Sequence, residues 1–214
     1  MKKAFLFILM AAFFLGTGAA HALPVTVTYT ADNIVNAWYQ DGAAPVTLGL
    51  GLNASNWKIA DSATLDLDYN THYQLIWQVS NSGDPSLGNP AGFLAQIDLG
   101  GSQILSSSSF MYDADGGDTN NFEDLSWDWS STTEYGNNGG SNIWTSVNGG
   151  PVMGIDTDAQ WIWASTNFDK MVSDHQNIFI KAEFTTPVAE PATLLLLGAG
   201  LVGVAGLRRK FGKG

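Results

Sequence analysis

The strongest constraint on the fold of this chain is an alternation of apolar and polar residues that recurs along its middle part. Five segments show it, and their apolar positions are Val25, Val27 and Tyr29; Leu65, Leu67 and Tyr69; Tyr73, Leu75, Trp77 and Val79; Phe93, Ala95, Ile97 and Leu99; and Ile178, Ile180, Ala182 and Phe184. A period of two is typical of strands with one buried face. In the last segment we expect the alternating residues Lys181 and Glu183 to face solvent.

Clusters of Gly, Asn, Asp, Ser and Pro separate these segments, as at residues 41–42, 82–85 and 149–151. Such clusters mark turns. No long stretch has the 3.6-residue period of an amphipathic helix. The pattern therefore predicts an all-β fold, a single β-sandwich or jelly roll over residues 23–187.

Residues 106–150 are more polar than the rest of this domain and are rich in Ser, Asp, Asn and Gly. A long polar stretch inside a compact domain is often a functional loop. We predict a loop-rich excursion between strands, with a hairpin over residues 125–130.

Residues 1–22 have the three parts of a secretory signal peptide. Lys2 and Lys3 form the basic start, residues 4–15 are apolar, and Ala20 and Ala22 flank His21 in a small-x-small cleavage site. We expect signal peptidase to cut after Ala22, so that the domain is exported.

Residues 188–214 form a second segment that directs the chain to a membrane. Within it, residues 192–207 carry no charge. They would make a helix about 24 Å long. A bilayer core is roughly 30 Å thick, so this predicts a short transmembrane helix. The basic cluster Arg208, Arg209 and Lys210 is expected to stay on the cytoplasmic side.

This tail resembles the PEP-CTERM sorting signal. The resemblance rests on Glu190 and Pro191, on the Leu- and Gly-rich run 194–207, and on Arg208, Arg209 and Lys210; Ala189 stands where the motif has its first Pro. It implies a protein of a Gram-negative, exopolysaccharide-producing bacterium, anchored in the inner membrane. An exosortase, which is a membrane transpeptidase, would then cut near the motif and leave the protein on the surface or in the extracellular matrix.

A second resemblance covers the middle domain. Its pieces are residues 30–33, Asn56 with Trp57, residues 88–97 and residues 155–161, in that order. Together they resemble a galactose-binding-like jelly-roll module. This implies a β-sandwich but assigns no binding residue.

The charge of the domain limits its partners. Nineteen of the 20 acidic residues but three of the nine basic residues lie between residues 23 and 189, which gives this part a formal charge of −16. Such a surface repels phosphate backbones, so we expect no nucleic acid partner. Divalent cations, neutral glycans and basic proteins remain compatible with it.

Sequence signals for catalysis are weak. The chain has no Cys, and the domain holds two histidines, His72 and His175. Neither a Gly-x-Ser-x-Gly elbow nor a His-Glu-x-x-His helix is present. We therefore expect a protein that is not an enzyme.

For metal, the best candidates are Asp113, Asp115 and Asp118, with Asp124 closing the site. Carboxylates at short spacing in a Gly-containing loop suit calcium, the cofactor that this sequence admits. The spacing is not that of an EF-hand, and a solvated acidic loop is the alternative. Asp156 and Asp158 form a weaker candidate pair.

For glycans, the signal is aromatic. Trp127 and Trp129, like Trp161 and Trp163, are spaced so that both rings of a pair share one strand face. We expect Trp161 and Trp163 to fill the core. Trp127 and Trp129 lie in the polar excursion, where a sugar platform and a core role are both open.

These features lead to three hypotheses for function. The leading one is a non-catalytic component of the cell surface or exopolysaccharide matrix. A glycan-binding, lectin-like module and a secreted hydrolase are the alternatives.

Overall fold

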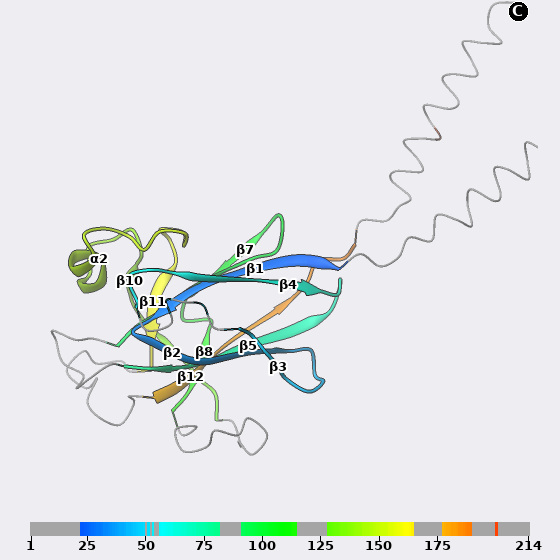
Figure 1. Cartoon of the computed structure of the whole chain (residues 1–214), viewed down its shortest axis with the longest axis horizontal. Coiled ribbons are helices and arrows are strands. Elements are labelled where there is room, and N and C mark those ends of the chain that lie inside the picture. The colour runs from blue at the N-terminus through cyan, green and yellow to red at the C-terminus, as the bar shows by residue number, and fades with distance from the viewer. Residues whose placement is uncertain are drawn as a thin grey trace, which may run out of the picture.

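Two antiparallel sheets packed face to face form a β-sandwich in the computed structural model of this chain (Figure 1). The structure describes residues 22–49, 51, 53, 56–81, 91–114, 128–164, 177–189 and 200. The predicted all-β sandwich is confirmed. The signal peptide up to residue 21 lies outside the described residues, as does the predicted helix 192–207 apart from Gly200.

The first sheet, sheet A, has the strand order β10-β11-β6-β1-β4, with β7 also paired to β6. Its strands are β1 (Leu23–Ala31), β4 (Asp61–Leu67), β6 (Phe93–Asp98), β7 (Gln103–Leu105), β10 (Thr133–Asn137) and β11 (Gln160–Trp163). In β1, Val25, Val27 and Tyr29 are buried as predicted. Tyr69, predicted to continue the strand of Leu65 and Leu67, instead follows the end of β4.

The second sheet, sheet B, has the order β3-β2-β5-β12-β8-β9. Its strands are β2 (Asn33–Gln40), β3 (Val46–Thr47), β5 (His72–Ser80), β8 (Met111–Asp113), β9 (Ser130–Ser131) and β12 (Asn177–Thr185). The predicted excursion over residues 106–150 thus supplies β8, β9 and β10. Of the hairpin predicted over 125–130, residues 125–127 lie outside the described residues, and β9 pairs with β8.

The core between the sheets is centred on Trp77 of β5, which is fully buried. Its ring lies 5.0 Å from that of Phe93 and 6.1 Å from that of Tyr29, both on sheet A, and stacks on Phe110 at 6.4 Å. Because period-two alternation aims every second side chain of β5 at sheet A, Tyr73, Leu75 and Val79 are buried with it.

Part of the outer face of sheet A, over β11 and the start of β6, is also covered. Directly paired residues share a sheet face. Ile162 lies opposite Phe93, whose ring faces sheet B, so Trp161 and Trp163 point to the other side of the sheet. Both are buried, as predicted, but in a second apolar layer outside the main core. Trp144 of α2 (Ile143–Asn148) stacks on Trp161 at 5.0 Å, and Trp57 meets Trp161 edge-on.

The six-residue helix α2 lies beside β10 and β11 (Figure 1). So short a helix is marginal by itself. At its start the Asn142 side chain accepts from the N–H of Thr145 at 2.9 Å, and the N–H of Asn142 donates to the Thr145 hydroxyl at 3.2 Å. Gly149, with a φ of 77°, ends the helix. This left-handed conformation is one that glycine adopts without strain.

Tyr29 gives a first prediction about stability. Its hydroxyl is buried and, among the residues that the structure describes, has no hydrogen-bond partner. Burial and the nearby charge of Asp61 raise the pKa of this phenol. An unpaired buried hydroxyl costs about 1–3 kcal/mol, so Tyr29→Phe should raise the free energy of unfolding by about 1 kcal/mol or more, measured by denaturant titration.

The matched control is Tyr73→Phe. The Tyr73 hydroxyl accepts from the backbone N–H of Asp68 at 3.0 Å. Loss of this bond should lower the free energy of unfolding by about 0.5–1.5 kcal/mol. Destabilisation of similar size in both variants would contradict the prediction for Tyr29.

Candidate functional site

The candidate site is the outer face of sheet B, formed by the side chains of β2, β5 and β12 that point away from sheet A. Strand register defines its rows, since directly paired residues share a face. Gln40 lies opposite Gln74, which lies opposite Glu183. In the next row, Trp38 lies opposite Ile76, which lies opposite Lys181.

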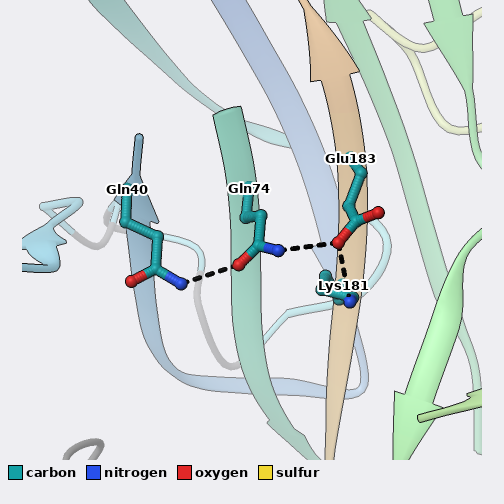
Figure 2. Close-up of polar contacts among 4 residues, drawn as sticks. All are labelled: Gln40, Gln74, Lys181 and Glu183. Carbon is teal, nitrogen blue, oxygen red and sulfur yellow. Dashed lines mark hydrogen bonds and ion pairs between the residues drawn. The ribbon is translucent and has the colours of Figure 1, made fainter. Parts of the chain in front are cut away.

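The first row, Gln40, Gln74 and Glu183, is a continuous hydrogen-bonded chain, referred to below as the polar row (Figure 2). The Gln40 amide donates to Gln74 Oε1 at 2.7 Å, and the Gln74 amide donates to Glu183 Oε1 at 2.7 Å. Lys181 Nζ, from the next row, donates to the same Glu183 oxygen at 2.8 Å. The chain of bonds fixes which atom each amide presents.

Lys181 corrects the sequence interpretation. It points to the outer side of the sheet but is not solvent-facing, because its side chain is 8% exposed, whereas that of Glu183 is 40% exposed, as expected. The ring of Trp129 lies over its ammonium group, 4.5 Å from nitrogen to ring centre. The hydrogen bond from Lys181, opposed by partial burial and helped by the ammonium charge, lowers the pKa of Glu183.

Two half-buried tryptophans flank the row of Ile76 and Lys181. Trp129, for which the sequence left a platform and a core role open, packs on Lys181, and Trp38 stacks on Phe179 with centroids 6.2 Å apart. Trp127, its predicted partner, lies outside the described residues. Sequence reasoning missed Trp38, although Asn36, Trp38 and Gln40 alternate along one strand face.

A second amide pair continues this face. Asn36 donates to Gln78 Oε1 at 2.8 Å across β2 and β5. The described part of the outer face therefore combines amides, one partly exposed carboxylate and partly exposed aromatic rings. This combination can bind ligands that both donate and accept hydrogen bonds.

The predicted calcium site is largely outside the described residues, which include Asp113 but not Asp115, Asp118 or Asp124. Asp113 is buried, and its carboxylate accepts from the N–H of Asp128 at 2.9 Å. Among the residues that the structure describes, no three His, Asp or Glu side chains gather closely enough to hold a metal ion. Calcium binding stays a prediction.

The weaker candidate pair, Asp156 and Asp158, forms a turn on the other side of the sandwich. Asp156 accepts from the N–H of Asp158 at 2.9 Å and from the Gln103 side chain at 2.9 Å. These two bonds lower the pKa of Asp156, the backbone bond more strongly.

The junction between the sandwich and the tail is tightly held. The Thr186 hydroxyl accepts from the N–H of Thr71 at 2.9 Å and donates to the carbonyl of Asp68 at 2.6 Å. The N–H of Asn70 donates to the Pro187 carbonyl at 3.0 Å. Val188, directly after this junction, is 70% exposed. The chain leaves β12 at the end of the sandwich where β1 begins (Figure 1).

A family model for the PEP-CTERM protein-sorting motif matches residues 187–210. The chain carries a PEP-CTERM motif. It is therefore an exosortase substrate, exported and held in the membrane by its C-terminal region before processing. Of the predicted motif residues, Ala189 is described and exposed, whereas Glu190, Pro191, Arg208, Arg209 and Lys210 lie outside the described residues.

The PEP-CTERM match covers the tail and leaves the sandwich unassigned. No curated protein matches the chain, and no solved structure matches it. The resemblance to a galactose-binding-like module stays a prediction. Within the described ranges, no helix is long and apolar enough to cross a membrane.

Proposed function

We propose that this protein is a non-catalytic component of the cell surface or exopolysaccharide matrix of a Gram-negative bacterium, released from its membrane anchor by an exosortase. The observation that carries the proposal is the position of the PEP-CTERM motif. The matched segment begins at residue 187, directly after Thr186 is hydrogen-bonded into the sandwich. The whole sandwich would therefore stay on the exported side of the cut.

The non-catalytic part is supported by how three carboxylates of the described residues are used. Asp61 accepts from the backbone and side chain of Asn53, Asp113 accepts from the N–H of Asp128, and Glu183 accepts from Lys181 and Gln74. Each stabilises local structure through these bonds. General acid–base catalysis needs carboxyl groups that are placed to exchange protons with a substrate.

The test is deletion of residues 194–214 in the native host. We expect the full-length protein to enter the membrane fraction and then appear in mature form, with intact mass showing an end near Pro191. The deletion variant should instead be soluble and exported. These outcomes follow because the apolar run is the predicted anchor.

A chain that lacks only Lys213 and Gly214 is the control, because it keeps all three parts of the tail. It should be processed like the wild type. If the mature wild-type protein still carries Gly214, the tail is a permanent anchor and the proposed cleavage by an exosortase is wrong.

A further inference from the structure

We propose that the outer face of sheet B binds a neutral glycan, with Gln40, Gln74 and Glu183 as hydrogen-bonding groups and with Trp129 and Trp38 as flanking rings. This inference names a ligand class for the sandwich of the proposed surface protein. A binding experiment tests the glycan site, whereas mass and fractionation test the processing of the tail. Either proposal can therefore fail while the other stands.

The polar row has unused hydrogen-bonding capacity. Among the described residues, Glu183 Oε2 and Gln40 Oε1 accept no hydrogen bond, whereas Gln74 Oε1 accepts from Gln40 and Glu183 Oε1 accepts from Gln74 and Lys181. Each amide nitrogen of the row also carries a second N–H. Sugar hydroxyls donate and accept, so a mixed row of fixed donors and acceptors suits them. Because the row is already ordered, binding would cost little side-chain entropy.

Aromatic groups lie next to this row. Neighbouring rows on one strand face are two residues apart, which is roughly 7 Å along the strand. Trp38 therefore lies one row from Gln40. The ring of Trp129 is fixed over Lys181, which itself bonds Glu183. Both rings are partly exposed, as stacking on a sugar requires.

Charge decides between neutral and acidic glycans. Lys181, a cation next to the polar row, is buried under Trp129 and paired with Glu183. The domain around it has a formal charge of −16 between residues 23 and 189. A polymer of uronic acids would be repelled by this field, whereas a neutral glycan would not.

The two outer faces of the sandwich present different groups to solvent, and the long amides and rings of sheet B suit a sugar better than the short hydroxyl side chains of sheet A. On sheet A the second apolar layer of Trp144, Trp161 and Trp57 covers the part over β11 and the start of β6, whereas the outward side chains of β1 and β4, such as Thr28 and Ser62, are short and at least partly exposed. On sheet B the outward side chains of Ile76 and Phe179 are buried, but the longer amides of Gln40, Gln74 and Gln78 remain partly exposed beside Trp38.

The experiment is affinity gel electrophoresis of the full-length chain in mild detergent. The gels contain hydroxyethyl cellulose, galactomannan, the exopolysaccharide of the host, or alginate as the acidic probe. We expect at least one neutral polymer to slow the wild type. Trp129→Ala should then weaken binding about tenfold, on the scale known for stacking on aromatic rings, and Gln74→Ala about three- to tenfold.

Gln103→Ala is the matched control. It removes the same side chain from the opposite sheet, where Gln103 bonds Asp156, and should bind like the wild type. Melting curves of all variants separate lost binding from lost folding. If Trp129→Ala unfolds, Gln40→Ala, at the β2 end of the row, takes its place.

Three outcomes would overturn the proposal. The first is that no neutral polymer, including that of the host, slows the wild type. The second is binding that survives both Gln74→Ala and Gln40→Ala in folded protein. The third is stronger retention by alginate than by every neutral polymer, which would contradict the charge argument.

Discussion

Trp144→Ala should lower the free energy of unfolding by about 3–5 kcal/mol, the usual cost of removing a buried tryptophan. Trp144 is 4% exposed and joins three parts of the fold. Its ring is nearly parallel to that of Trp161, at 8° and 5.0 Å, and lies 6.0 Å from that of Tyr135. Because α2 is too short to be stable alone, loss of this ring should also detach the helix. Urea titration followed by circular dichroism measures the loss.

The same helix offers the control, because Val147 is 57% exposed. Val147→Ala should change the free energy of unfolding by less than about 0.5 kcal/mol. Gly92 tests the packing from the other side, because a Cβ there would come within 2.8 Å of the Trp144 ring. Gly92→Ala should therefore be destabilising in the wild type and nearly neutral in the Trp144→Ala background. A small loss for Trp144→Ala would show that the second apolar layer is not needed for the fold.

The long strands could be predicted from sequence because their pattern is local. In β5 and β12 the predicted inner positions, such as Trp77 and Ile180, are buried. The two-residue strands β3 and β9 carry no such period, and their pairing depends on neighbours far along the chain. They could not be identified from the sequence alone.

The second apolar layer shows where alternation misleads. Phe93 and Leu94 are consecutive and both fully buried, because sheet A is covered on both faces at the start of β6 and on β11. A period of two assumes one solvated face. The apolar pair at 93–94, with Ile162 between two tryptophans, was a sequence signal for two-sided burial. The capping box of Asn142 and Thr145 was a second missed signal. Thr145 stands where this motif usually has Glu or Gln, so the sequence did not reveal it.

The candidate site was predictable only in part, for a related reason. Trp129 stood out because it lies in a polar segment. The polar row did not, since Gln74 and Glu183 are 109 residues apart and Gln40 and Gln74 are 34 apart. Only the register of β2, β5 and β12 brings the three together. Such rows are a property of pairing, which composition and spacing do not reveal.

Asn138→Ala should lower the free energy of unfolding by about 3 kcal/mol or more, because alanine would leave several buried groups unpaired at about 1–3 kcal/mol each. Asn138 is fully buried and holds the loop between α2 and β11. Its amide donates to the carbonyls of Val152 at 3.0 Å and Ile155 at 2.9 Å, and its oxygen accepts from the N–H of Val152 at 2.8 Å. Urea titration of the variant against the wild type measures the loss.

The matched control for Asn138 is Asn148, which also donates to loop carbonyls but is partly exposed. Its bonds to Gly150 and Pro151 are longer, at 3.2 and 3.5 Å, and water can replace them. Asn148→Ala should therefore cost less than about 1 kcal/mol. Hydrogen exchange gives a second measurement: the N–H of Val152 should exchange faster in Asn138→Ala and unchanged in Asn148→Ala. Equal effects of the two substitutions would mean that water, rather than the Asn138 side chain, pairs with the backbone groups of this loop.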